Sequence, residues 1–255
     1  LYLQGSDYPT EDEQFEAYRT AAQTMAGKPL IIRTLDVGGD KKLPTLELPH
    51  EDNPFLGFRA IRMTLSHPEI FRPQLRAILR AAAYGDVRVM FPMIGSMDQL
   101  REAKALLREQ EQTLQAEGVP TGPVKVGMMV EIPAAAVLAE EFAKEVDFFS
   151  IGTNDLTQYT LAVERGNAAV AHLYAPEHPA VLRLIAMTAQ AAAERHIPCG
   201  MCGEAAGDPK LAPAFVGMGV NELSMSPRRV PAVRKLLSEL TMDECRQAAE
   251  KLLHP

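Results

Sequence analysis

Short apolar runs alternate with longer amphipathic segments along the chain, and this alternation constrains the fold more than any other feature. The runs are rich in β-branched and aromatic residues, as buried strands are. We predict six strands, at residues 29–34, 87–93, 124–130, 147–151, 198–201 and 222–225. Ala-, Leu- and Glu-rich segments are predicted helices, at residues 7–27, 68–83, 97–117, 134–144, 179–195, 209–218 and 231–240. Strand-then-helix repetition predicts a parallel sheet with helices outside it.

Polar residues gather where the predicted strands end. The clearest case is the run from Phe148, which stops at Thr153-Asn154-Asp155. Side chains of this kind follow four runs: Arg33, Glu131, Asn154 with Asp155, and Cys202. Both a β/α barrel and an open doubly wound sheet bind ligands beyond the carboxyl ends of their strands, so both folds stay open. A plainer alternative is that Asn154 and Asp155 cap the following helix.

Size and composition indicate one soluble domain over residues 1–255. A chain of 255 residues, 47% of them apolar, can bury a sizeable core. No apolar run approaches the ~18 residues that a membrane span needs, so we expect no membrane partner. Three cysteines and no visible secretory signal indicate reduced thiols, and we expect a cytoplasmic protein.

The charge distribution argues against nucleic acid as a partner. The net charge is −7, and the arginines are scattered over separate segments instead of forming a basic stripe. A chain with this charge needs a local positive pocket or a metal ion to hold an anionic ligand.

The stretch from Phe148 to Thr160 resembles the signature of phosphoenolpyruvate-utilising enzymes, a family that includes enzyme I of the sugar phosphotransferase system and pyruvate phosphate dikinase. Further blocks that resemble enzyme I lie in order at residues 32–41, 53–62, 130–135 and 200–204. Residues 33–41 and 159–167 favour the enzyme I branch, or its fused multiphosphoryl relatives. The resemblance covers nearly the whole chain.

This resemblance implies an α/β fold of the (β/α)8 TIM-type barrel. Since the sequence contains six predicted strands, we expect the barrel to lack its first two strands in this chain. We interpret the chain as a fragment of a longer protein. Residues 1–6 also faintly resemble a processing scar.

Glu131 and Asp155 are the predicted metal ligands. Each is a hard oxygen donor at the end of its own strand, and Mg²⁺ is typically held by one or two carboxylates with substrate oxygens and water. The alternative is that these carboxylates bond to loop amides or to an arginine.

Guanidinium groups are the predicted ligands of the substrate, because phosphoenolpyruvate carries a phosphate and a carboxylate. The resemblance implies that Arg33 contacts the phosphate and that Arg165 makes a further substrate contact. It assigns Asn154 and the backbone of Asp155 to the same ligand. We expect Arg59 to join the phosphate cluster.

Two neighbouring features are expected to be structural. We place Arg62 on the same helix as Arg59 and expect it to pair with a carboxylate such as Asp52 or Glu69. Gly38 and Gly39 beside Lys41 lack a complete phosphate-binding motif and are predicted to form a turn.

Cys202 is the predicted catalytic thiol. Cys199 and Cys202 are three residues apart in an extended segment, so they point to opposite faces, and we expect Cys199 to pack in the core. The alternative is that both thiols are buried. The resemblance makes Cys202 the acid that protonates the methylene carbon of enolpyruvate, a role that suits a thiol with a reference pKa of ~8.5.

No histidine here lies in a recognisable acceptor motif. The resemblance therefore implies a phosphorylated histidine on a separate amino-terminal domain, a phosphocarrier protein as a further partner, and a homodimer. Two alternatives remain: a barrel like that of pyruvate phosphate dikinase or phosphoenolpyruvate synthase, and a non-catalytic ligand-sensing or dimerisation module.

Overall fold

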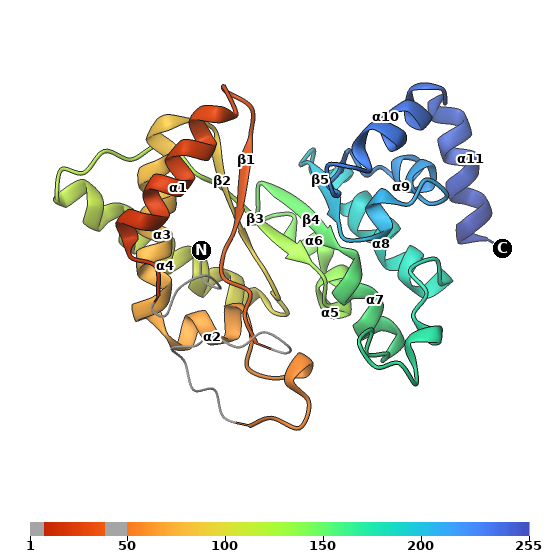
Figure 1. The fold of residues 1–255 in the computed structure, drawn as a ribbon, viewed down its shortest axis with the longest axis horizontal. Helices are drawn as coiled ribbons and strands as arrows, with labels where there is room; N and C mark the ends of the chain where they lie inside the picture. The colour runs from red at the N-terminus through yellow and green to blue at the C-terminus, as the bar shows by residue number, and fades with distance from the viewer. Residues whose placement is uncertain (1–7, 39–49, 255) are drawn as a thin grey trace. The chain divides into compact units, whose positions relative to one another are not determined.

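The computed structural model describes residues 8–38 and 50–254 (Figure 1). The chain divides into two compact units, residues 1–127 and 128–255, and each is described by itself. The strands follow the order β1-β2-β3-β4-β5-β6, so neighbours in the chain are neighbours in the sheet. This is the parallel α/β architecture that the sequence predicts.

The first unit consists of helices that pack against a parallel strand pair. Its elements are α1 (Glu11–Thr24), β1 (Leu30–Arg33), η1 (Pro54–Leu56), α2 (Ile61–Ser66), α3 (Pro68–Ala81), η2 (Ala82–Tyr84), β2 (Val87–Phe91) and α4 (Met97–Ala116). β3 (Lys125–Val130) begins in this unit. β1 pairs with β2 in parallel, and Arg33 lies opposite Met90.

Helices α1, α3 and α4 lie on one side of β1 and β2 in Figure 1. α1 begins with a capping box, in which Thr10 and Glu13 bond to each other's backbone. The Phe71 ring of α3 meets the Phe91 ring of β2 edge to face, with 6.2 Å between centroids. Arg76 of α3 binds Glu11 of α1 at 2.6 Å, which ties the two helices together.

The second unit repeats the strand-then-helix pattern. Its elements are α5 (Pro133–Val137), α6 (Ala139–Phe142), β4 (Phe148–Gly152), α7 (Thr153–Leu161), η3 (Ala171–Leu173), α8 (Pro179–Glu194), β5 (Cys199–Cys202), η4 (Ala205–Gly207), α9 (Ala212–Gly217), β6 (Glu222–Leu223), α10 (Val230–Ser238) and α11 (Met242–Leu253). β4 pairs with β5 and β5 with β6, both in parallel. Gly152 lies opposite Cys202, so the carboxyl ends of β4 and β5 are level.

β4 is buried along its whole length, including Ser150, as its mostly apolar sequence predicts. The other five predicted strands also correspond to strands, although β6 is only two residues long. The predicted helix over residues 134–144 is interrupted at Leu138, which lies between α5 and α6. Helix α11 was not predicted, whereas α2 and α7 correspond to the helix expected around Arg62 and to the one expected after Asn154 and Asp155.

The cap that the sequence suggested for α7 is wrong. Gly152 is the N-cap residue and no side chain caps the helix, while Asn154 and Asp155 lie inside its first turn. The single domain and the eight-stranded barrel stay predictions. Among residues 8–38 and 50–254, no helix has both the length and the apolar character that crossing a membrane requires.

Candidate functional site

Two hydrogen bonds join the end of β4 to the end of β5. The Thr153 hydroxyl donates to the Cys202 carbonyl oxygen at 2.9 Å. The Glu204 amide donates to Asn154 Oδ1 at 3.1 Å. Between them lies Gly203, with φ +104°, where an added Cβ would clash with the Thr153 hydroxyl. The loop after β5 can therefore approach α7 this closely only because residue 203 is glycine.

The two predicted metal ligands are both buried in this unit. Glu131 is 1% exposed and Asp155 is 8% exposed. Glu131 follows β3, yet its side chain reaches the end of β4: a Cβ added at Gly152 would lie 2.9 Å from Glu131 Oε2. Gly152 thus makes room for this carboxylate directly before the turn that carries Asp155.

Two buried carboxylates offer hard oxygen ligands of the kind that divalent metal ions bind. No group of three or more His, Cys, Asp or Glu side chains with metal-binding geometry occurs among the described residues. Mg²⁺ does not need one, because it is commonly held by one or two carboxylates and keeps several water ligands. Two carboxylates could hold a divalent ion only together with further ligands such as water.

Tyr174 connects Arg165 with the turn at the start of α7. Its hydroxyl donates to the Asn154 carbonyl oxygen at 3.2 Å. Burial raises the pKa of Tyr174; the charge of Arg165 opposes this rise, whereas those of Glu204 and Asp155 add to it. These three charges therefore all affect one phenol. Arg165 itself is exposed, and Gln158 Oε1 accepts a 3.1 Å hydrogen bond from its backbone amide.

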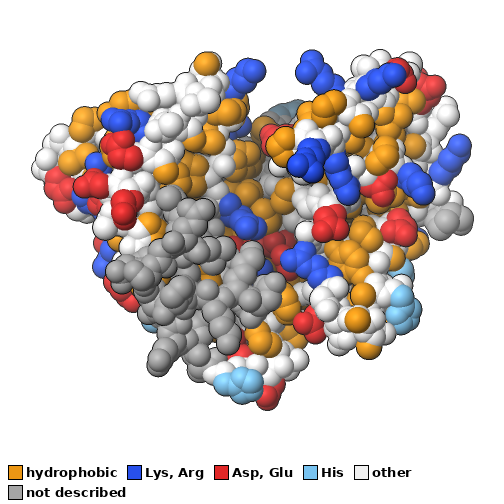
Figure 2. Space-filling model, in the orientation of Figure 1, with side chains coloured by type: hydrophobic (Ala, Val, Ile, Leu, Met, Phe, Trp, Pro, Cys, Tyr) orange, Lys and Arg blue, Asp and Glu red, His pale blue; other side chains and the backbone are white. Residues whose placement is uncertain are grey.

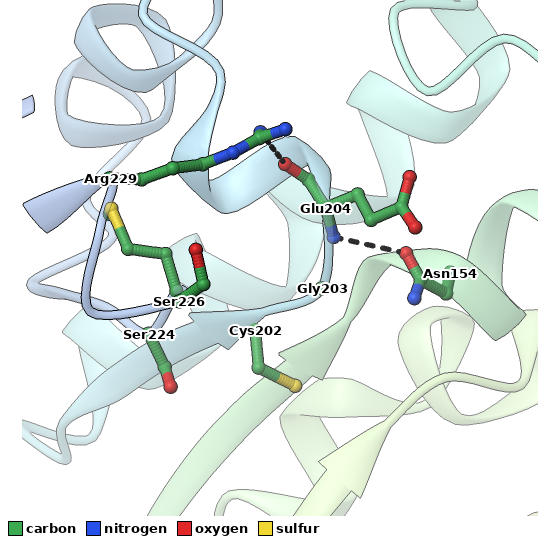
Figure 3. Close-up of a pocket in the computed structure, with 8 residues that line it drawn as sticks. Asn154, Cys202, Gly203, Glu204, Ser224, Ser226 and Arg229 are labelled. Carbon is green, nitrogen blue, oxygen red and sulfur yellow. Dashed lines mark hydrogen bonds between the residues drawn. The ribbon is translucent and has the colours of Figure 1, made fainter.

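A cavity of about 500 Å³ opens beside the thiol of Cys202 (Figure 3). Its lining comes from the ends of β4, β5 and β6: Asn154, Cys202, Gly203, Glu204, Ser224, Met225, Ser226 and Arg229. Figure 3 shows Glu204 between Asn154 and Arg229, with its backbone bonded to both side chains. The residues that line the cavity thus carry hydroxyl, amide, thiol, thioether, carboxylate and guanidinium groups.

Sequence reasoning missed Arg229. Its Nη1 donates to the Glu204 carbonyl oxygen at 3.4 Å, and a Cβ added at Gly207 would lie 2.8 Å from Arg229 Cδ. The missing side chain at Gly207 therefore leaves space for the arginine stem. The signal was present in Ser226-Pro227-Arg228-Arg229, a basic pair just after the last predicted strand.

The two thiols of β5 occupy different environments, as their spacing predicts. Cys199 is 1% exposed, and burial raises the pKa of its thiol to about 12. Cys202 is partly exposed and lines the cavity. The alternative with two buried thiols is wrong.

Two of the predicted phosphate ligands meet in the first unit. Arg59 Nη2 donates to both carboxylate oxygens of Asp36, at 3.0 and 3.1 Å, and Arg33 Nη1 lies 3.4 Å from Asp36 Oδ2. The guanidinium of Arg59 also lies over the Phe55 ring, 5.8 Å from its centroid. Lys41 and Gly39 lie outside the described residues.

Two details of this region differ from the sequence expectation. Arg59 precedes α2 instead of lying on it, since the helix begins at Ile61. Arg62 does lie on α2, and its guanidinium donates to the carbonyl oxygens of Leu56 and Gly57 instead of pairing with Asp52 or Glu69. Backbone carbonyls were the available acceptors because the η1 turn lies directly beside the helix.

Figure 2 shows Lys and Arg side chains interspersed with acidic and apolar ones on the face that it draws. The expectation that nucleic acid is not a partner stays a prediction.

Comparison with known proteins gives consistent results. The model of the family described as "PEP-utilising enzyme, PEP-binding domain" matches residues 1–242. A phosphoenolpyruvate-protein phosphotransferase from Bacillus sp. (strain S) is 54% identical over 99% of this chain and 44% of its own length. The protein of that name from Bacillus subtilis (strain 168) is 52% identical over 99% of this chain and 45% of its own. The chain therefore spans less than half the length of these relatives.

Among solved structures, a citrate lyase from Burkholderia xenovorans LB400 matches with a TM-score of 0.51 and 22% identity. The match covers 74% of this chain and 60% of the lyase chain. At this identity the likeness concerns the fold alone.

Proposed function

The chain belongs to the family of phosphoenolpyruvate-utilising enzymes, as their phosphoenolpyruvate-binding domain, and on that premise we propose a function of enzyme I type. The domain binds phosphoenolpyruvate with Mg²⁺ and presents its phosphoryl group to a histidine on a separate domain, and pyruvate is released. The whole protein then works in the sugar phosphotransferase system as a phosphoenolpyruvate-protein phosphotransferase.

One observation carries this proposal: β4 and β5 bring an amide, a buried carboxylate and a partly exposed thiol to one edge of the second unit. The bonds from Thr153 to Cys202 and from Glu204 to Asn154 join the groups. Glu131 reaches the same edge from β3. An enolpyruvate ligand requires this combination, because its anionic oxygens need donors and its methylene carbon needs an acid.

Glu131 and Asp155 would hold the Mg²⁺ ion. When bound, the ion supplies positive charge that offsets the charge on the transferring phosphoryl group. Asn154 donates its amide hydrogens to the ligand. Arg165 contributes a further charge beside Tyr174, and Arg33 with Arg59 binds the phosphate.

Cys202 completes the reaction by moving one proton. The bond between the enol oxygen and phosphorus breaks as phosphorus bonds to the acceptor histidine nitrogen, which leaves the enolate of pyruvate. The thiol proton of Cys202 passes to the methylene carbon, forming the methyl group of pyruvate. The resulting thiolate regains a proton from water, so the thiol is restored.

Several parts of this proposal concern the longer protein. They are an eight-stranded barrel with two further strands from a preceding segment, a phosphohistidine domain, a phosphocarrier protein as the next acceptor, a homodimer and a cytoplasmic location. The length of the relatives, of which this chain covers 44–45%, supports the presence of further segments. A dikinase-like activity is less well supported, because the two relatives named above carry the phosphotransferase name.

A reconstitution experiment tests the proposed function. The chain is mixed with phosphoenolpyruvate, Mg²⁺ and the separately purified part of the Bacillus subtilis relative that lies outside the matched 45%, and pyruvate is measured. We expect pyruvate release that requires both the added part and Mg²⁺. Binding of phosphoenolpyruvate without any pyruvate would instead support the ligand-sensing module, and release without the histidine domain would contradict the transfer.

A further inference from the structure

Asp36 is a buried carboxylate between two arginines in the first unit. Its side chain is 3% exposed, whereas the side chains of Arg59 and Arg33 are 6% and 39% exposed. Arg59 contacts both carboxylate oxygens, and Arg33 contacts only Oδ2, at 3.4 Å. Two of the three side chains, Arg59 and Asp36, are thus buried, and the third, Arg33, is partly exposed. We call these three residues the Asp36 cluster.

Backbone contacts fix Arg59 relative to Asp36 in the Asp36 cluster. The amide of Ala60 donates to the Val37 carbonyl oxygen at 3.0 Å, next to Asp36 in one segment and Arg59 in the other. Gly38 has φ +114°, and an added Cβ there would lie 2.5 Å from Arg59 Cβ. The two segments therefore touch backbone to backbone, which sets the Arg59 guanidinium against Asp36.

The backbone conformation of Ala60 indicates that the surrounding structure holds Arg59 against Asp36. Ala60 has φ 50° and ψ −126°, a region that favours glycine, and it is fully buried. Such backbone strain persists only where the surrounding structure determines it, and it is common at functional sites. An ion pair on the surface would form without a strained backbone beside it.

Burial gives Asp36 a specific energetic role. A carboxylate shielded from water is stable only when paired, and the two-oxygen contact with Arg59 supplies that pairing. Asp36 is shared between the two guanidiniums: Arg59 contacts both of its oxygens and Arg33 contacts one.

We propose that Asp36 is a positioning residue: it is held by Arg59 and in turn fixes the guanidinium of Arg33 for the phosphate of phosphoenolpyruvate. The proposal rests on the proposed function for its ligand. In addition to its proposed phosphate contact, Arg59 then has the task of holding Asp36.

The first test measures the orientation of Arg33 without any ligand. In the full chain labelled with ¹⁵N, the Arg33 Nε–H signal is assigned by its loss in Arg33→Lys, and its relaxation is compared between the wild type and Asp36→Asn. We expect the Arg33 guanidinium to become mobile in Asp36→Asn. An unchanged Arg33 signal would overturn the proposal. Asp52→Asn, at a highly exposed carboxylate, is the matched control.

The second test is a double-mutant cycle on phosphoenolpyruvate affinity with Arg33→Ala and Asp36→Asn. We expect Asp36→Asn to weaken binding about tenfold in the wild type and hardly at all when Arg33 is already alanine. Equal weakening in both backgrounds would show that Asp36 acts through general stability, and would overturn the proposal. If the wild type binds no phosphoenolpyruvate but Asp36→Asn mobilises Arg33, the proposed function fails and the positioning role stands.

Discussion

The Thr153 hydroxyl donates a 2.9 Å hydrogen bond to the carbonyl oxygen of Cys202. These residues are the first of α7 and the last of β5, so the bond joins the amide-bearing turn to the thiol-bearing strand. The second bond, from Glu204 to Asn154, joins the same segments on the other side of Gly203. Two fixed points leave the thiol and the amide little freedom relative to each other.

Gly203→Ala should destabilise the chain and displace the thiol. The new methyl group would clash with the Thr153 hydroxyl, and the backbone has φ +104°. We expect a loss of about 2 kcal/mol or more in the free energy of unfolding, measured by urea denaturation.

Gly118→Ala is the matched control for this substitution. Gly118 also has a positive φ, +71°, but nothing lies within 4 Å of an added Cβ. It should show only the cost of backbone strain, about 1 kcal/mol. Equal losses at both positions would mean that the contact between Gly203 and Thr153 contributes nothing.

Cys202→Ala should separate binding from chemistry. The substitution removes the proposed acid and leaves the oxygen and guanidinium ligands in place. We expect an unchanged phosphoenolpyruvate affinity with pyruvate formation reduced at least a hundredfold, measured in the reconstituted system. Cys245→Ala, at a buried thiol of α11, should leave both unchanged. Lost affinity with normal turnover would exclude the assigned role of Cys202.

Glu131→Gln should abolish the Mg²⁺ dependence of binding. The amide keeps the shape of the buried side chain but removes the charge that a hard cation needs. We expect phosphoenolpyruvate affinity with Mg²⁺ to fall tenfold or more, to the value found without Mg²⁺. The control is Glu140→Gln on the exposed surface of α6. A metal response that persists in Glu131→Gln would place the ion elsewhere.

Arg229→Ala should weaken phosphoenolpyruvate binding about threefold to tenfold, because it removes the positive charge from the cavity beside Cys202. Arg228→Ala provides the comparison, since Arg228 is also exposed but does not line that cavity. Affinity and its dependence on salt are both measured. Equal affinity and equal salt dependence in the two variants would show that Arg229 does not contribute to the binding site.

Stability should decline in mild alkali because of Cys199. Burial raises the pKa of its thiol from 9.0 to about 12, so the unfolded chain loses the proton at lower pH than the folded chain does. The folded state binds more protons between these values, and its stability falls by up to about 1.4 kcal/mol per pH unit above pH 9. Urea midpoints at pH 8 and pH 10 should differ less in Cys199→Ala than in the wild type. An equal change of the urea midpoint between pH 8 and pH 10 in the wild type and in Cys199→Ala would contradict the burial of this thiol.

The sequence predicted features that depend on local periodicity. β4 is mostly apolar and is buried throughout. The spacing of Cys199 and Cys202 predicts one thiol in the core and the other at the cavity. α11 could also have been predicted, because Thr241 and Glu244 form a capping box that was present in the sequence.

Features that depend on long-range contacts were not predictable in this way. Nothing local shows that Arg59 lies before its helix with its guanidinium on Asp36, since this follows from the contact between Gly38 and Arg59. From the sequence alone, Arg229 resembles any other surface arginine. Its place at the cavity follows from its hydrogen bond to the Glu204 carbonyl oxygen and from the space that Gly207 leaves for its side chain. Both cases depend on a glycine that is distant in the sequence.

Calorimetric titration of this chain with phosphoenolpyruvate tests the central claim most directly. The titration is carried out with and without Mg²⁺, on the wild type and on Glu131→Gln. We predict saturable binding of one ligand per chain that requires Mg²⁺ and is lost in Glu131→Gln. Absence of binding with Mg²⁺ present, or binding of equal strength in all four titrations, would contradict a Mg²⁺-dependent phosphoenolpyruvate site at the ends of β3, β4 and β5.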